Sequence, residues 1–302
     1  MRICSLLPGA TEIAYALGLE AQIVGVTHEC DYPPDAQYKP ILVKSAIDPK
    51  TMTSAEIDRK VAELLQAGKG LYSIDEAGFI AAAPDIILTQ GLCEVCALDY
   101  AEVEKAAAKL ARPPQILSLN PHSLNDILDD IQRVGAITQR DQRAGAMMRE
   151  LRQRIEAIGY EETPYRPRVV CLEWFEPLYT AGHWVPEMVA LAGGRDVLGQ
   201  AGQPSARIEW QQVIDAKPEV LLLMPCGFDT RRTVREATPL RALPGWQDLP
   251  AVKTANVYAL NGNAYFSRPG PRLINGLEIL ARLLHPPIPA VDIDPSDAAQ
   301  LN

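Results

Sequence analysis

The chain has no long hydrophobic run and no excess of positive charge. Among its 302 residues, apolar stretches such as that from Val220 to Cys226 fall far short of the roughly 18 residues that a membrane-spanning helix needs. The 29 Lys and Arg residues are outnumbered by 38 Asp and Glu residues, which gives a net charge of −9. Nucleic acids and anionic membranes select for clustered positive charge. The composition therefore argues against a nucleic-acid partner and against membrane insertion.

The conventional signatures of catalysis are also missing. The sequence contains no Gly-x-Ser-x-Gly nucleophile elbow, no Gly-x-x-x-x-Gly-Lys-Ser/Thr phosphate loop and no Gly-x-Gly-x-x-Gly dinucleotide turn. His183 and Glu187 are four residues apart, but Pro186 lies between them and the chain has no His-Glu-x-x-His motif. We therefore expect a protein that is not an enzyme, with an active site assembled from distant residues as the open alternative.

No secretory signal is visible at the N-terminus. The segment from Met1 to Gly9 has one basic residue, and Pro8 interrupts its apolar run. A signal peptide needs an apolar core of roughly 7–15 residues followed by small residues at the cleavage site. Together with six cysteines, this favours reduced thiols and a cytoplasmic location. A chain that starts at the mature end of an exported protein would look the same, so a periplasmic or cell-surface location is the alternative.

What the sequence does contain is an alternation of short apolar strands and helices, in two stretches. In the first, a strand over Ile3–Leu7 and a Pro-Gly turn precede a helix over about 11–17 and a strand over 23–27. In the second, a strand begins at Arg168 and a helix runs over about 186–191. Strands that alternate with helices predict a mostly parallel sheet. The expected fold class is α/β, with two Rossmann-like lobes.

Later segments of the two stretches resemble one another. Residues 83–93 and 217–226 each have a Pro-acid pair, then an apolar run typical of a buried strand, then a loop with a cysteine. Residues 116–121 and 257–262 are then predicted as equivalent strands, each ending in Asn before a turn. Internal duplication and chance similarity between α/β units both remain open as explanations.

One long helix is predicted between the lobes. Apolar residues recur at helical spacing from Ser123 to about Ile158, and Ser123 and Asp126 are placed as a capping box. At 1.5 Å per residue such a helix would be on the order of 50 Å long, more than the width of one domain. Because the heptad pattern fails over residues 138–145, a rigid spine that joins two lobes is favoured over a coiled coil.

This organisation predicts an N-terminal lobe over residues 1–121, a connecting helix over 122–160 and a C-terminal lobe over 161–287. Pro164 and Pro167 mark the start of the second lobe. The Pro- and Asp-rich tail, residues 288–302, is expected to be loosely ordered.

Aromatic residues, proline, glycine and amides are concentrated in the loops that follow the predicted strands. In open parallel sheets, ligands collect beyond the carboxyl ends of the strands. Trp174 and Trp184 lie close to one such loop, and Trp210 follows another turn. Large aromatic faces with a few polar groups suit a bulky, flat, partly apolar ligand. Local packing would explain any single aromatic residue, but together they favour a cleft.

Cys93-Glu-Val-Cys96 is the strongest short motif in the chain. It supplies half of a zinc site, and His28 could add a ligand if loops from different strands converge. A redox pair would need a thioredoxin-like unit, which is missing around it. Structural thiols, a possible zinc site and a redox pair therefore stay open. A zinc-binding enzyme or sensor is the second functional hypothesis.

Four segments resemble the substrate-binding proteins of ABC importers of the cobalamin and iron-siderophore type. They are Ser5-Leu-Leu-Pro-Gly-Ala-Thr-Glu-Ile13, Ala83-Pro-Asp-Ile-Ile87, residues 184–194, and Arg268-Pro-Gly-Pro-Arg272. The likeness covers roughly residues 1–285, and the order and spacing of the segments make it specific. Within that superfamily the sequence is most similar to the vitamin B12-binding branch.

The resemblance implies that cobalamin, or a related corrinoid, is held in a cleft between the lobes by aromatic faces and a few hydrogen bonds, with little domain closure. It implies a monomer that requires no cofactor and works with an ABC permease, for whose basic residues Glu56 and Glu187 are candidate contacts. The positions expected to line the cleft are Pro8, Gly9, Ala10, Tyr32, Gln90, Trp174, Trp184, Trp210, Phe228 and Tyr265.

Two features depart from the usual pattern of that family, namely the absence of a visible signal and the Cys93–Cys96 motif. They favour a cytoplasmic relative that binds, stores or senses a corrinoid. A haem or ferric-siderophore binder is a third hypothesis that uses the same cleft. An anionic siderophore would need arginines that face the cleft, and Arg207, Arg268 and Arg272 keep that hypothesis open.

Overall fold

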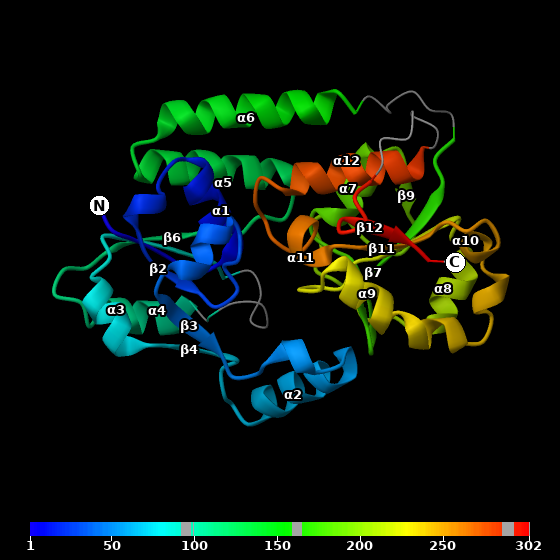
Figure 1. Ribbon diagram of the computed structural model, residues 1–302, viewed down its shortest axis with the longest axis horizontal. Helices are drawn as coiled ribbons and strands as arrows, with labels where there is room; N and C mark the ends of the chain where they lie inside the picture. The colour runs from blue at the N-terminus through cyan, green and yellow to red at the C-terminus, as the bar shows by residue number, and fades with distance from the viewer. Residues whose placement is uncertain (92–97, 99, 159–164, 286–292, 302) are drawn as a thin grey trace.

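The computed structural model describes residues 1–91, 98, 100–158, 165–285 and 293–301, which form two α/β lobes (Figure 1). The strands of the first lobe are β1 (Ile3–Ser5), β2 (Ile23–Thr27), β3 (Ile41–Ser45), β4 (Tyr72–Ile74), β5 (Ile86–Thr89) and β6 (Gln115–Ser118). Its helices are α1 (Pro8–Ala16), α2 (Ser54–Gln66), α3 (Glu76–Ala82), α4 (Tyr100–Ala107), α5 (Leu124–Ile137) and α6 (Asp141–Glu156).

The second lobe is built in the same manner. Its strands are β7 (Arg168–Phe175), β8 (Leu178–Thr180), β9 (Arg195–Asp196), β10 (Val220–Leu223), β11 (Val257–Leu260) and β12 (Ala298–Gln300). Its helices are α7 (Val185–Leu191), α8 (Trp210–Ala216), α9 (Thr230–Glu236), α10 (Pro250–Lys253), α11 (Gly262–Tyr265) and α12 (Leu273–Leu284).

Each lobe has one sheet whose central strands are parallel. The first sheet has the order β4-β3-β2-β1-β5-β6, and only its edge strand β4 pairs in the antiparallel sense. The second has the order β12-β11-β10-β7-β8, with β9 parallel to β7, and its two outermost strands β12 and β8 are antiparallel. The central strands are short apolar runs such as that of β10, all four residues of which are buried, as expected where helices cover both faces. The predicted fold class is confirmed.

The single long helix predicted between the lobes is wrong. The helical pattern is divided between α5 and α6, and α6 folds back along α5 (Figure 1). The capping box of Ser123 and Asp126 begins α5 as predicted. The break comes at Gln139, whose φ of 59° is left-handed and cannot continue a helix. The failure of the heptad pattern over residues 138–145 coincides with this turn, but the prediction of one helix takes it only as evidence against a coiled coil. Helical apolar spacing continues on either side, because two helices packed together need the same apolar stripe as one helix packed on two lobes.

The helix α6 nevertheless reaches the second lobe. Arg154, in its last turn, donates two hydrogen bonds to Glu278 of α12, of 2.8 and 2.9 Å. One cluster of buried apolar side chains also draws on both lobes, and includes Ile131 of α5, Leu151 of α6 and Leu277 of α12. The two lobes thus share a core beneath these helices.

The expectation of a loosely ordered tail is wrong for the last described residues. Residues 298–300 form β12, which pairs with β11, and the side chain of Leu301 is only 7% exposed. Burial of Leu301 and the backbone hydrogen bonds to an edge strand hold this end in place. The predicted boundaries near 160 and 287 fall at residues outside the described ranges and stay predictions. Within the described ranges, every helix is too short or too polar to span a bilayer.

Candidate functional site

Loops that follow the strands of one sheet contact loops that follow the strands of the other. Gly9, after β1, lies against Pro269, and Asp31, after β2, hydrogen-bonds to Asn263, after β11, at 3.2 Å. Met52, after β3, accepts a 2.7 Å hydrogen bond from Arg232, after β10. We call the region of the first two contacts, where residues of 8–32 meet residues of 263–272, the inter-lobe seam, and the third contact lies beside it. It lies at the carboxyl ends of the parallel strands, where ligands of such sheets collect.

Two arginines of the second lobe are paired with carboxylates of the first. Arg268 is 8% exposed; it forms an ion pair with Asp31 and donates a 3.0 Å hydrogen bond to the carbonyl oxygen of Glu29. Arg272 donates two hydrogen bonds to Glu12, at 2.9 and 2.6 Å. A bidentate pair of this kind fixes orientation as well as charge. The seam is therefore held together by charge as well as by the shared core.

Burial sets the electrostatics of these pairs. It raises the pKa of Glu12, and the hydrogen bond and positive charge of Arg272 oppose that rise. Burial also acts to raise the pKa of Asp31, but the hydrogen bond and charge of Arg268 outweigh it and hold that pKa below its usual value. Arg268 and Arg272 are thus each neutralised by a carboxylate of the other lobe.

The structure brings Tyr32 and Tyr265, two of the predicted cleft residues, to the same arginine. The guanidinium of Arg272 lies 3.8 Å above the ring of Tyr32 and 6.0 Å from that of Tyr265. The Tyr265 hydroxyl donates to Asp297 at 2.8 Å, and burial together with that carboxylate raises its pKa to about 12. Tyr32 is 41% exposed and comes from the first lobe, so the two rings reach the seam from different lobes.

Trp174 and Phe228, also predicted, form a pair within the second lobe. Their ring centroids are 5.3 Å apart at a tilt of 55°, a common arrangement for aromatic pairs. Arg232 covers the Phe228 ring at 3.6 Å, and the same arginine bonds to Met52 of the first lobe. This aromatic pair therefore stands directly beside the seam.

The other predicted residues lie elsewhere or are covered. Ala10 is fully buried in the core, and Trp184 is 5% exposed with its indole N–H bound to the carbonyl of Phe266 at 2.8 Å. Trp210 stacks on Trp246 within the second lobe, with centroids 6.0 Å apart. Ala10 and Trp184 have little surface to offer a ligand, as has Phe228, which is 2% exposed, whereas Trp210 is half-buried.

Three predicted residues lie at strand ends in the first lobe. Pro8 is the first residue of α1 and is half-buried, and Gln90, 8% exposed, directly follows β5. Gly9 is in the seam itself, because a Cβ there would stand 2.4 Å from the carbonyl oxygen of Pro269. Only glycine allows the two backbones to approach so closely.

Sequence reasoning did not select the carboxylates of the seam. Glu12 and Arg272 both lie inside the segments that carried the family resemblance, and Asp31 is next to Tyr32. The signal that could have found them is the presence of a carboxylate on the otherwise apolar helix α1, since a buried Glu needs a partner.

The metal hypothesis gains no support from the described residues. Cys93 and Cys96 lie outside them, and His28 places Nδ1 3.2 Å from the carbonyl oxygen of Val43. Burial raises the pKa of the Cys4 thiol to about 12 and also raises that of Cys30, so both stay protonated and are poor metal ligands. Within the described ranges, no three His, Cys, Asp or Glu side chains gather closely enough to hold a metal ion.

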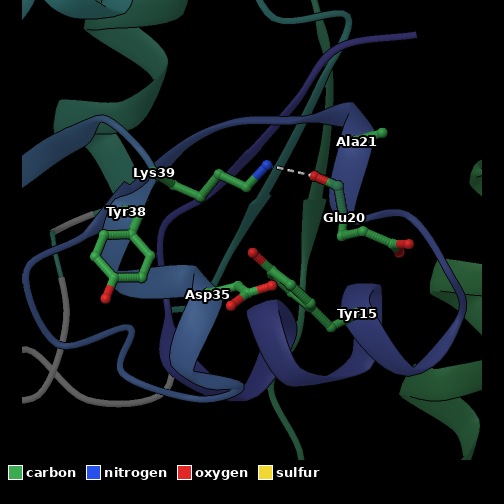
Figure 2. Close-up of a pocket in the computed structure, with 6 residues that line it drawn as sticks. All are labelled: Tyr15, Glu20, Ala21, Asp35, Tyr38 and Lys39. Carbon is green, nitrogen blue, oxygen red and sulfur yellow. Dashed lines mark hydrogen bonds between the residues drawn. The ribbon is translucent and has the colours of Figure 1, made fainter.

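A separate pocket of about 480 Å³ lies on the first lobe (Figure 2). Figure 2 shows Tyr15 of α1 and Asp35 on one side and Lys39 on the other, with the Lys39 ammonium donating to the carbonyl oxygen of Glu20 at 2.6 Å. Ala21 and Tyr38 complete the lining. None of these residues was among the predicted cleft residues.

Comparison with known proteins gives the family. Residues 3–264 match the family model described as periplasmic binding protein. The chain belongs to this family. The vitamin B12-binding protein of Vibrio cholerae is 26% identical over 282 residues, which cover 92% of this chain and 86% of the relative. That of Yersinia pestis is 24% identical, over 90% of this chain and 82% of the relative.

Solved structures show the same fold. The periplasmic vitamin B12-binding protein BtuF of Vibrio cholerae has a TM-score of 0.67 at 23% identity, covering 94% of this chain and 96% of its own. The haem-binding protein HutB of the same organism has a TM-score of 0.71 at 18% identity, and the match covers 95% of this chain and 99% of HutB. The resemblance to the substrate-binding proteins is thus confirmed. These relatives are named as binding proteins, several of them periplasmic, so the expected cytoplasmic location is unsupported.

Proposed function

We propose that this protein binds cobalamin or a related corrinoid at the inter-lobe seam, as the substrate-binding component of an ABC importer. The relatives named vitamin B12-binding proteins cover nine-tenths of the chain, and aromatic side chains flank the seam in both lobes. The observation that carries the choice of ligand is the charge balance of the seam.

A corrin is bordered mostly by neutral amide groups, whereas haem propionates and catecholate siderophores are anionic. Anionic ligands need arginines that are free to pair with them. Arg268 and Arg272 are each already paired with a carboxylate. Arg207, the third candidate, is exposed and lies in the second lobe, bridged to Tyr179. Arg232, which covers Phe228, bonds to the neutral carbonyl of Met52 and is the arginine best placed to meet an anion. The paired state of Arg268 and Arg272 favours a neutral, amide-rich ligand, and comparison with haem and a ferric catecholate tests whether Arg232 reverses that preference.

Aromatic and amide side chains would contact different parts of the corrinoid. Trp174 and Tyr32 offer aromatic faces against which the apolar corrin face would pack. Gln90 and Asn263 offer amides that both donate and accept hydrogen bonds, which suits the amides at the corrin edge. Because the lobes share a core and the Arg154–Glu278 pair, the ligand would bind without a large rotation of the lobes.

The permease contact and the periplasmic location belong to the same proposal. Of the two acidic candidates, Glu187 is occupied between the lobes, where its carboxylate accepts from the backbone N–H of Leu124 at 2.9 Å. Glu56 caps α2 through Thr53, whose N–H and hydroxyl keep the pKa of Glu56 low. Glu56 stays ionised at the surface and is the better candidate to meet a basic permease residue.

The test is a titration of the purified protein with cyanocobalamin, haem and a ferric catecholate, followed by quenching of tryptophan fluorescence. We expect saturable one-to-one quenching by cyanocobalamin, with micromolar or tighter affinity. Trp174→Ala should weaken binding at least about tenfold, since buried aromatic anchors carry much of a binding energy. Trp210→Phe, away from the seam, is the matched control and should bind as the wild type does.

Two outcomes would overturn the proposal. Tight binding of haem or the catecholate with no response to cyanocobalamin would replace the corrinoid by an anionic chelate. Cyanocobalamin binding that is unchanged in Trp174→Ala but lost in Trp210→Phe would move the site away from the seam.

A further inference from the structure

A segment of the first lobe crosses to the second lobe at the edge of the molecule opposite α6. Figure 1 shows α2 on one side of the two lobes and α6 on the other. Residues 47–70, which join β3 to β4 and contain α2, form this segment, and we call it the crossing segment. The lobes therefore meet at two opposite edges, with the seam residues between them.

Two hydrogen bonds hold the crossing segment to α9 of the second lobe. Arg232 donates to the carbonyl oxygen of Met52 at 2.7 Å, and the backbone N–H of Ser54 donates to Glu236 at 3.2 Å. The helix α2 also lies against β7, the strand that carries Trp174. Because Arg232 rests on Phe228, the segment lies over the aromatic pair that includes Trp174, one of the residues proposed to hold the ligand.

The apolar contact beneath this segment is small. Of the 13 residues of α2, only Ser54 and Ile57 are buried, and Leu65 is 45% exposed. By contrast, seven of the 14 residues of α5 are buried. Stabilisation by burial scales with the apolar area removed from water. The crossing segment is therefore one of the parts that open at low free-energy cost, as segments with few buried contacts do.

The polar contact is also easily reversed. The half-buried guanidinium of Arg232 has its pKa lowered by burial, and its Nε atom has no hydrogen-bond partner. Its bond to Met52 is to a neutral carbonyl, and release of that bond would return the guanidinium to water. In the same region, burial raises the pKa of Asp58 on α2, and Arg207 of the second lobe opposes the rise.

The residues at the two ends of the crossing segment are held together by backbone pairing, and a glycine near one end allows the rest of the segment to change direction. The N–H of Ala46 donates to the carbonyl of Leu71 at 2.8 Å, which continues the pairing of β3 with β4. Gly68, at the end of α2, has a φ of +63°, and no atom lies within 4 Å of where its Cβ would be. A glycine in open space next to a fixed base is suited to absorb a change in backbone direction.

We propose that the crossing segment is a gate over the inter-lobe site. It opens when the bonds of Met52 to Arg232 and of Ser54 to Glu236 are released, and its opening sets the rate at which ligand enters and leaves. The shared core joins the lobes on the side of α6, so the movement is placed on the opposite side. The identity of the ligand rests on the proposed function, but the movement itself does not.

Hydrogen–deuterium exchange tests the movement without any ligand. We expect amides of α2 to exchange at least tenfold faster than those of α5, and Glu236→Ala to increase the exchange of α2 further while leaving α5 unchanged. Arg231→Gln, an exposed position on the same helix α9, should have no effect. Protection of α2 equal to that of α5 would overturn the gate.

Stopped-flow mixing with cyanocobalamin tests the control of access. Glu236→Ala should raise the association and dissociation rate constants together, by threefold or more, with the Kd changed by less than about twofold. Unchanged rate constants at normal affinity would contradict the gate. If cyanocobalamin binds to neither protein, the corrinoid proposal fails, and the exchange experiment alone decides whether the segment moves.

Discussion

At the residue scale, the meeting of the lobes depends on carboxylates that are costly to bury. Glu12 is 3% exposed on a helix whose other buried residues are uncharged, and Arg272 is the partner that makes this position tolerable. Taking a charge out of water costs several kcal/mol unless a partner and hydrogen bonds compensate. The same pair joins the first lobe to the second, so it helps to hold the two lobes in their relative position as well as to stabilise the fold.

Arg272→Met should therefore be severely destabilising. It removes both hydrogen bonds that Arg272 donates to the buried Glu12 and leaves Arg268, 4.0 Å away, as its counter-charge. We expect a loss of up to about 3–5 kcal/mol in the free energy of unfolding, measured by urea denaturation at pH 7.5. Burial already raises the pKa of Glu12, and loss of Arg272 raises it further above the unfolded value, so the folded variant binds the extra proton. The stability of the variant should thus recover as the pH falls from above the raised pKa of the folded state to below the pKa of the unfolded state.

The double variant Glu12→Gln/Arg272→Met removes both charges and should regain most of the loss. Arg231→Gln, which is exposed, should stay within about 0.5 kcal/mol of the wild type. A loss below 1 kcal/mol in Arg272→Met would mean that Glu12 is compensated by other groups.

At the element scale, the hairpin of α5 and α6 depends on a close approach of two helices. A Cβ added at Gly135 of α5 would stand 2.5 Å from the Cβ of Ala144 of α6. Thr138 closes α5 by donating to the carbonyl of Val134 at 2.6 Å, and Gln139 then reverses the chain. Small residues at the crossing thus allow a turn that the apolar spacing alone did not predict.

Two glycine substitutions on these helices should have opposite effects. Gly135→Ala gains up to about 1 kcal/mol of helix propensity, but the clash with Ala144 should leave a net loss of roughly 1–3 kcal/mol. Gly145→Ala on α6 meets only the flexible end of Arg149, at 3.6 Å, and should stabilise by up to about 1 kcal/mol. Thermal and urea unfolding would measure both.

The double variant Gly135→Ala/Ala144→Gly restores the space between the helices and should recover part of the loss. Equal effects of the two single substitutions would show that helix propensity, and not the approach of α5 to α6, governs position 135.

At the scale of the whole molecule, the lobes are joined by a shared core beneath α5, α6 and α12, by the seam, and by the crossing segment. The first of these is apolar and extensive, the second is charged, and the third is small and polar. Their different strengths give the molecule a stiff side and an easily opened side. Access to the site is therefore expected from the side of α2.

Gly9→Ala should disturb the relation between the lobes. Its Cβ would stand 2.4 Å from a backbone oxygen of Pro269, which cannot yield as a flexible side chain can. We expect a loss of roughly 1–3 kcal/mol in stability and a weaker affinity for cyanocobalamin, measured by urea unfolding and by the fluorescence titration. Normal affinity with normal stability would show that the lobes can separate here without cost.

The sequence by itself determined the α/β class, the positions of most strands, the capping box of α5 and the family resemblance. These follow from local periodicity, from Pro and Gly at element ends, and from short motifs in order, all of which can be seen within a few residues. Tertiary structure alone decided that Asp31 meets Arg268, which lies 237 residues away. It also divided the long helix at Gln139, covered Ala10 and Trp184, and carried α2 across to α9. Each of these depends on which surfaces pack together, and no local pattern specifies the partner of a buried charge or the direction in which a helix turns back.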